Sequence, residues 1–296
     1  MSRHPFYWVD AFTTHALGGN PCAVVFDADS LSAEQMQAIA REMNLSETAF
    51  VLKSDKADFR ARYFTPESEI PLAGHPTIAT MKALVDAGKI GLEKTAKTVS
   101  LQLEAGIIKV DLQPDPAGLR IVMSQLKPRF LKTYEPREVL PALGLIEEDL
   151  LPGAPLQTVS TGSQFLMVAL RDQAALRKVQ IDFARFRTLR DRSDFRSAHF
   201  FCLQGISAEA KTFARHPGLP PDTLEDPFTG SATGCMGSYL WKYGLISEPS
   251  FIAEQGHWMG RPGWAEVEVV GARDAIETVR VAGRAVTIIR GDLSIP

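Results

Sequence analysis

The sequence predicts an α+β fold of two pseudo-symmetric lobes, each a curled, mostly antiparallel, barrel-like sheet around one central helix. Two observations predict it: the window at residues 69–90 recurs 156 positions later, and strand-like runs outnumber helical ones around both copies. A chain of 296 residues is long enough for two lobes of ordinary size. The matching positions are Glu69 and Glu225, Pro71 and Pro227, Gly74 and Gly230, Leu84 and Leu240, Gly88 and Gly244, and Ile90 and Ile246.

Each copy of the repeat is expected to form a buried helix. A proline and a glycine open it, about three turns of small and apolar residues follow, and a glycine ends it. Helices commonly stop at such a glycine, so we expect helices over residues 75–87 and 231–243. The second is almost free of charge and should be enclosed on most sides. Unpaired N–H groups at the start of a buried helix bind anions, so we expect two anion sites that face one another.

The first lobe, residues 1–125, is predicted to hold one further helix and several strands. The helix begins after Ser32, whose hydroxyl caps it while Gln35 reaches back, and it ends near Asn44. Runs of apolar and β-branched residues between turn residues indicate the strands. They are expected at residues 6–12, 21–26, 48–52, 58–65, 98–103, 106–112 and 119–123.

The second lobe, residues 126–284, follows a boundary at 125–136, where prolines and charges replace the strand pattern. The last strand, about residues 285–296, can rejoin the first lobe. One helix is expected at residues 136–143, and one or two solvated surface helices are expected within 172–190. Two strands are expected within 158–170, on either side of Gly162. Further strands are expected at residues 197–203, 210–214, 265–270 and 279–289.

Charge and cysteine content exclude several classes of function. The 32 basic and 35 acidic residues nearly balance, so we expect no nucleic acid and no membrane as partner. The chain has neither a long apolar run nor an apolar N-terminal signal, which predicts a cytoplasmic protein. The three cysteines lie far apart, and neither a nucleotide-binding loop nor a metal-binding motif is found, so no disulfide or metal is expected.

Four side chains near the two helix starts are candidates for catalysis. Glu47 lies between Leu45 and an apolar strand, where partial burial raises a carboxyl pKa into the range useful for proton transfer. His75 begins the first helix, and Ser231 has the equivalent position in the second. Asp226 precedes the second helix and is a candidate second proton carrier. Each of them alone also fits a structural role, such as a helix cap, so the prediction depends on their shared placement.

Motifs over nearly the whole chain resemble one known family. They are VDAFT (9–13), GNPCAV (19–24), NLSETAF (44–50), FTP (64–66) with Glu69, AGHPT (73–77), EDP (225–227), TGSA (229–232), EQG (254–256) and MGRP (259–262). Together they are specific, and they are similar to those of the PhzF-like isomerases of phenazine biosynthesis, which have the diaminopimelate epimerase fold. The resemblance implies two similar lobes with the active site in the cleft between them.

The same resemblance implies roles for individual residues. It implies that Glu47 moves a proton on the substrate, that His75, Asp226 and Ser231 surround the substrate, and that the two helix starts hold its carboxylate. The residues implied in substrate binding are Asn20, Ala73, Gly74, Thr229 and Gly230. The resemblance also implies an enzyme that needs no cofactor and forms a homodimer.

We therefore expect a cofactor-independent isomerase that moves a proton on a small, cyclic or unsaturated carboxylate. Epimerases of this fold carry catalytic thiols where this chain has Ala73 and Thr229, and Cys235 lies about one and a half turns into its helix, so an amino-acid racemase is the less favoured alternative. A small-molecule binding protein without catalysis is the other. Gly263, where the family commonly has serine, and a long, proline-rich loop at 215–224 leave the substrate open.

Overall fold

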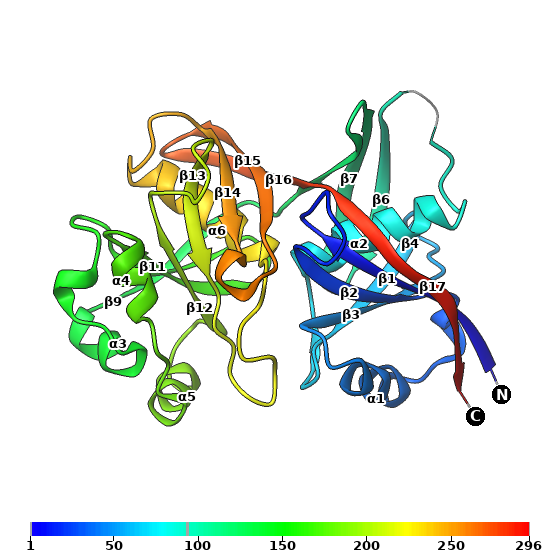
Figure 1. The fold of residues 1–296 in the computed structure, drawn as a ribbon, viewed down its shortest axis with the longest axis horizontal. Helices are drawn as coiled ribbons and strands as arrows, with labels where there is room; N and C mark the ends of the chain where they lie inside the picture. The colour runs from blue at the N-terminus through cyan, green and yellow to red at the C-terminus, as the bar shows by residue number, and fades with distance from the viewer. Residues whose placement is uncertain (1, 93–94, 296) are drawn as a thin grey trace.

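The computed structural model describes residues 2–92 and 95–295 and places the two related helices in different halves of the molecule (Figure 1). Helix α2 (Gly74–Asp86) lies in the N-terminal half, defined as residues 2–124 and 285–295. Helix α6 (Gly230–Lys242) lies in the C-terminal half, residues 125–284. Both helices begin at the predicted glycines and have 13 residues, so this prediction is confirmed.

The N-terminal half consists of a sheet around α2 and one further helix, α1 (Ala33–Met43). The predicted capping box is present: Ser32 accepts a hydrogen bond from the amide of Gln35, whose side chain accepts one from the amide of Ser32. Strands β1 and β17 pair, so the two termini lie side by side (Figure 1). The strands are β1 (Ser2–Ala11), β2 (Asn20–Val25), β3 (Glu47–Leu52), β4 (Phe59–Phe64), β5 (Glu69–Ile70), β6 (Lys97–Leu103), β7 (Gly106–Asp115), β8 (Gly118–Ser124) and β17 (Ala285–Ile295).

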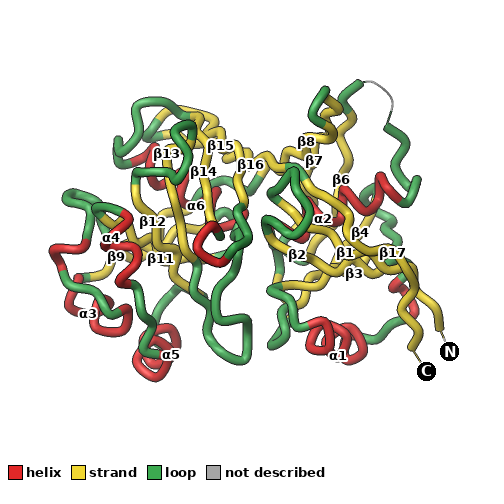
Figure 2. The backbone as a smooth tube through the Cα atoms, viewed as in Figure 1, coloured by secondary structure: helices red, strands yellow, loops and turns green. Residues whose placement is uncertain are grey.

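The C-terminal half surrounds α6 in a similar way, with three short helices on its outer side (Figure 2). These helices are α3 (Pro136–Leu143), as predicted, and α4 (Gln173–Lys178) and α5 (Phe183–Asp191), which confirm the pair expected on the surface. The strands are β9 (Arg129–Tyr134), β10 (Leu156–Ser160), β11 (Gln164–Leu170), β12 (Ser197–Cys202), β13 (Ala210–Arg215), β14 (Ser250–Gln255), β15 (Gly263–Ala272) and β16 (Ala275–Gly283).

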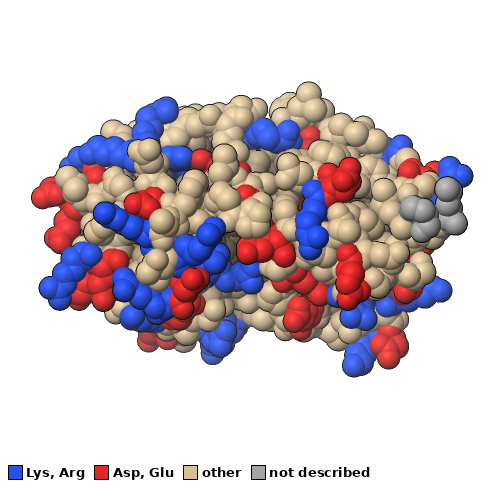
Figure 3. All heavy atoms as spheres, turned by 90° about the horizontal axis from the view of Figure 1, so that it is seen from below, with Lys and Arg blue, Asp and Glu red and all other residues tan. Residues whose placement is uncertain are grey.

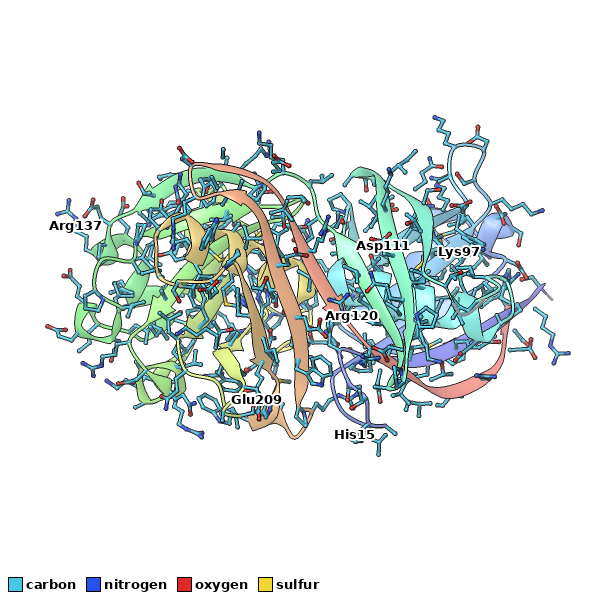
Figure 4. All side chains as sticks on the ribbon, turned by 90° about the horizontal axis from the view of Figure 1, so that it is seen from above. His15, Lys97, Asp111, Arg120, Arg137 and Glu209 are labelled. Atoms are coloured by element: carbon cyan, nitrogen blue, oxygen red, sulfur yellow. The ribbon has the colours of Figure 1, made fainter. Side chains whose placement is uncertain are left out.

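One hydrogen-bonded sheet runs through both halves, because β8 pairs with β16 and places Val122 opposite Ala282. Arg120 of β8, labelled in Figure 4, adds an ion pair of 2.6 Å to Glu266 of β15 at this junction. The strands pair in the order β9, β10, β11, β12, β13, β14, β15, β16, β8, β7, β6, β4, β3, β2, β1, β17, and β5 pairs with β4. The parallel pairs are β2 with β3, β4 with β6, β11 with β12 and β13 with β14.

The two buried helices touch at their first residues. A Cβ atom on Gly74 would lie 2.5 Å from the backbone nitrogen of Ser231, so only glycine permits this approach. Phe12 closes the contact from the other side: its ring packs against Gly230 and stacks on Phe228 with 4.3 Å between ring centroids. The starts of α2 and α6 therefore meet at the junction of the two halves.

Two predictions about strands were wrong. Strand β9 lies within residues 125–136, where no strand was expected, and pairs with β10. The single strand expected over 279–289 is the end of β16 and the start of β17, separated at Arg284. Small and apolar residues continue on both sides of this break, so the sequence does not reveal that the chain leaves the C-terminal half and returns to the N-terminal half there.

Strand β14 was not predicted because its last two residues, Glu254 and Gln255, are polar. Both are buried, and their side chains bind backbone groups: Glu254 accepts from the amide of Ile206 at 2.6 Å, and Gln255 donates to the carbonyl of Asp226 at 2.6 Å. In residues 2–92 and 95–295, no helix is long and apolar enough to cross a membrane.

Candidate active site

A cleft of about 480 Å³ lies between the two halves, beside the starts of α2 and α6. Figure 3, a view from below, shows a hollow between the halves with basic residues gathered on one side and acidic residues on the other. The N-terminal half contributes Ser46, Glu47, Thr65, Glu67, Ser68, Ile70, Leu72 and Ala73 to the lining; the C-terminal half contributes Ser163, Phe165, Arg190, Asp191, Phe195, Arg196, Ser197, His216, Gly218, Leu219, Asp222, Thr223, Asp226, Thr229 and Ser231.

Both helices present uncapped first turns to this cleft. Ala73 is the N-cap residue of α2 and has no side-chain acceptor, and Thr229, the N-cap residue of α6, makes no capping hydrogen bond. The Thr229 hydroxyl instead donates to Asp226 at 2.5 Å. Uncapped N–H groups and the positive ends of two helix dipoles favour an anion, and both N-cap residues line the cleft.

Glu47 enters the cleft from the start of β3. Asn44 ends α1 in a left-handed conformation (φ 50°), and three residues later Glu47 begins the strand. Its side chain is 18% exposed, and Oε2 lies 3.1 Å from Nδ1 of His75. Burial raises the pKa of Glu47 well above its usual value, and the nearby carboxylates of Asp226 and Asp222 raise it further. The fold therefore favours a protonated Glu47, as expected for a buried proton donor.

His75, the second residue of α2, is neutral at physiological pH. Its side chain is only 3% exposed, and burial lowers its pKa to about 4. Nδ1 faces both Glu47 and the side-chain nitrogen of Asn20, which lies 2.9 Å away. The two groups lie close together, but Oε2 of Glu47 makes no hydrogen bond with any described residue.

Asp226 is held by a buried hydrogen-bond network between the halves. Asn20 donates to Oδ1 of Asp226 at 2.6 Å and to the carbonyl of Phe228 at 2.8 Å, and Thr229 donates to Oδ2. Gln255 completes the network, since it donates to the backbone carbonyl of Asp226 and accepts from the amide of Thr229. The orientation of Asp226 is therefore fixed by residues of both halves.

The structure brings the four predicted catalytic side chains to one site. Glu47, His75 and Asp226 lie together, and Ser231 lines the cleft from the first turn of α6. Among the predicted substrate-binding residues, Ala73 and Thr229 also line it, whereas Asn20, Gly74 and Gly230 are not among the lining residues and lie behind it, in the Asp226 network and in the contact between α2 and α6.

Several residues of the site were not predicted, among them Arg196, Ser197 and His216 of the lining and Gln255 behind it. Gln255 lies in the EQG motif, which was noted without a role. The other three lie beside or on β12 and β13 and form no motif of their own, since pairing between these strands brings them together.

The cysteines cannot act as acid and base in this cleft. Cys235 is fully buried behind Thr161, 3.2 Å from its hydroxyl, and burial raises its pKa to about 12. Cys22 lies opposite Glu47 on the neighbouring strand β2, and burial raises its pKa as well. Neither is a lining residue. The cleft therefore lacks the pair of thiols that a two-thiol racemisation would require.

Glu47, His75 and Asp226 also offer three ligand atoms within 4.8 Å of one another, a spacing that a metal ion could bridge. The donor set fits such an ion poorly. Both oxygens of Asp226 already accept short hydrogen bonds, and the raised pKa of Glu47 favours the protonated carboxyl, whereas a metal ligand must be deprotonated. The arrangement is better suited to proton transfer.

Comparison with known proteins identifies the family of this chain. Residues 9–291 match the PhzC-PhzF family, described as phenazine biosynthesis-like proteins. The chain is 34% identical to an uncharacterized isomerase, YfhB, of Bacillus subtilis over 94% of both proteins. It is also 34% identical to the trans-2,3-dihydro-3-hydroxyanthranilate isomerase of Pseudomonas chlororaphis, over 98% of this chain and 99% of the other.

Solved structures share the fold. A PhzF-family phenazine biosynthesis protein of Bacillus anthracis superposes with a TM-score of 0.87 at 30% identity, over the full length of both chains. A hydroxyproline epimerase of Agrobacterium vitis gives a TM-score of 0.69 at 11% identity, over 98% of this chain and 92% of the other, and shows the fold alone. The chain thus has a mixed α/β fold with a large sheet, of the diaminopimelate epimerase-like type, and it is an isomerase that belongs to the PhzF family.

Proposed function

We propose that this protein is a cofactor-independent isomerase that moves a proton on a small, cyclic or unsaturated carboxylate. Trans-2,3-dihydro-3-hydroxyanthranilate, named for relatives at about one third identity, is one candidate substrate. The observation that carries the proposal is the position of the half-buried carboxyl of Glu47, 3.1 Å from the imidazole of His75 and beside two uncapped helix starts, where burial raises its pKa.

In the proposed reaction, Glu47 gives its proton to one carbon of the unsaturated system, and the electron pair of a neighbouring double bond forms the new C–H bond. The resulting carboxylate takes a proton from a second carbon, whose electron pair becomes the new double bond. Glu47 ends protonated, as it began, so no oxidant, reductant or cofactor is consumed. His75 and Asp226 keep the carboxyl oriented, and Ser231 contacts the substrate.

Charge supports a carboxylate as the ligand. The cleft lining contains five acidic side chains, Glu47, Glu67, Asp191, Asp222 and Asp226, and two basic ones, Arg190 and Arg196; the acidic groups would repel an anion if all were ionised. Burial raises the pKa of both Glu47 and Asp222, which lowers the negative charge in the cleft. Arg196, the first turn of α2 and the first turn of α6 then provide the positive potential that an anionic ligand needs.

A screen of small cyclic and unsaturated carboxylates in heavy water tests the proposal. The wild-type protein should incorporate deuterium at carbon, read by mass shift, and Glu47→Gln should lower the rate by about 10² to 10⁴, the usual contribution of a general acid–base group. Glu67→Gln is the matched control, because it removes a carboxylate from the same cleft that has no contact with His75. Full turnover by Glu47→Gln would show that the assignment is wrong, and loss of turnover after treatment with EDTA would point to a metal at Glu47, His75 and Asp226.

We also propose that the two halves are pseudo-symmetric lobes, residues 1–125 with 285–296 and residues 126–284, each derived from one ancestral unit. The equal lengths of α2 and α6 and the contact between their first residues support this proposal.

A homodimer is proposed on the family resemblance, and light scattering at micromolar concentration tests it directly.

A further inference from the structure

A line of three side chains runs from the cleft into the core of the C-terminal half. Ser197, at the start of β12, lines the cleft, and its Oγ lies 2.9 Å from Nε2 of His216, which also lines it. Nδ1 of His216 lies 3.2 Å from Nδ1 of His199, two residues further along β12. His199 is completely buried. The proposed proton transfer uses none of these three residues.

Burial favours the neutral form of both imidazoles, and a neutral imidazole carries a single N–H group. Burial lowers the pKa of His199 and of His216, and a positive charge on one ring would repel a positive charge on the other. The negative charges of Asp226 and Glu225 raise the pKa of His216 and so oppose the effect of burial. Glu225 is already paired with Arg215 at 2.7 Å, and Asp226 accepts hydrogen bonds from Asn20 and Thr229, so both carboxylates have other partners.

The contact between the two Nδ1 atoms couples the tautomers of the rings. A hydrogen bond there requires one Nδ1 to carry hydrogen and the other to be bare, and a neutral ring with a bare Nδ1 carries its hydrogen on Nε2. If His199 donates, His216 carries its hydrogen on Nε2 and donates to Ser197. If His216 donates, its Nε2 is bare and the Ser197 hydroxyl must donate inward to it.

One observation favours the direction in which His199 donates. Nε2 of His199 is buried and has no hydrogen-bond partner among the described residues. In the opposite direction this atom would be an N–H donor buried without an acceptor, in addition to the inward turn of the Ser197 hydroxyl. In the favoured direction the Ser197 hydroxyl accepts from His216, and its own hydrogen is free to point into a cleft whose expected ligand is an anion.

We propose that Ser197 is a ligand-binding residue whose hydroxyl donates a hydrogen bond to an oxygen of the bound carboxylate substrate, and that His216 and His199 are positioning residues that orient it. The ligand contact rests on the proposed function, whereas the direction of the hydrogen bonds does not. Ser163, another serine of the lining, has no such freedom, because its hydroxyl already donates to the carbonyl of Leu72.

Nitrogen-15 NMR of the ligand-free protein tests the direction of the hydrogen bonds. Long-range proton–nitrogen correlation distinguishes the two neutral tautomers, and the His199→Leu variant assigns the signals. The expected result is a hydrogen on Nδ1 of His199 and on Nε2 of His216, and in His199→Leu a mixture of both tautomers at His216. The reverse pair of tautomers in the wild-type protein would overturn the proposal, because Ser197 would then be committed to His216.

Ligand binding tests the second step, with anthranilate and 3-hydroxyanthranilate as aromatic probes, measured by calorimetry. Ser197→Ala should weaken binding about tenfold, the effect of losing one hydrogen bond to a charged or polar oxygen. Weaker binding of both probes supports the contact with the carboxylate, whereas weaker binding of 3-hydroxyanthranilate alone would place the contact at the ring hydroxyl and overturn the proposal. Ser193→Ala is the control and should retain the wild-type affinity, because Ser193 is not a lining residue of the cleft and its hydroxyl donates to the carbonyl of Leu189.

Unchanged affinity of Ser197→Ala for probes that the wild-type protein binds would overturn the proposal. Failure of the proposed function would look different. In that case the wild-type protein would bind neither probe, while the tautomers of His199 and His216 would still report the direction of the hydrogen bonds.

Discussion

At the scale of single residues, a buried carboxyl should make stability depend on pH. The pKa of Glu47 is higher in the folded than in the unfolded chain, whose ordinary value is 4.5, so the folded protein binds a proton that the unfolded chain has released. Stability therefore falls as the pH rises from 4.5 through the raised pKa of Glu47. Glu47→Gln cannot ionise, so it should melt a few degrees above the wild type at pH 8 and should lose this advantage towards pH 4. Parallel curves of melting temperature against pH for the two proteins would contradict this expectation.

Site residues that lie in local sequence motifs could be predicted, whereas site residues that come together only in the tertiary structure could not. Glu47, His75 and Ser231 lie at the starts of a strand or a helix that the sequence predicts, so their placement could be inferred. Ser197 and His216 become neighbours only when β12 pairs with β13, and no local signal marks either residue. The catalytic roles of the predicted residues stay predictions until a substrate is found.

At the scale of elements, the contact between α2 and α6 should tolerate only glycine. Gly74→Ala puts a Cβ atom 2.5 Å from the backbone nitrogen of Ser231, so the two helix starts must move apart. We expect a loss of about 1–3 kcal/mol in urea unfolding, the usual cost of overpacking, together with loss of activity. Gly91→Ala is the control, because its Cβ would meet no atom of the described residues within 4 Å. Equal stability of the two variants would contradict the close contact.

Elements bounded by glycine, proline or a capping box could be predicted from the sequence, as α1, α2, α3 and α6 show. Strands were harder to predict where the buried residues are polar and are stabilised by hydrogen bonds instead of apolar packing. Polar residues at the end of β14 are buried because backbone groups of other segments satisfy them, and this compensation depends on tertiary structure. The break at Arg284 occurs where the chain passes from the C-terminal half to the N-terminal half. The spacing of apolar residues along the sequence contains no information about this change.

At the scale of the whole molecule, the two halves should unfold together. One sheet passes through both, and one apolar core contains residues of each half, including Ile78, Leu101, Ala232 and Val267. We expect a single calorimetric transition whose measured enthalpy equals the van't Hoff enthalpy. Two resolved transitions would show that the halves are energetically independent despite their shared core.

The ladder between β8 and β16 also determines how the cleft can change its width. Four residue pairs, from Arg280 with Ser124 to Gly283 with Ile121, connect the halves through their backbones. The two halves therefore cannot rotate about a flexible linker, because any change in the width of the cleft must bend this hydrogen-bonded pair of strands. Its elastic stiffness, rather than the length of a linker, limits how far the two walls of the cleft can separate.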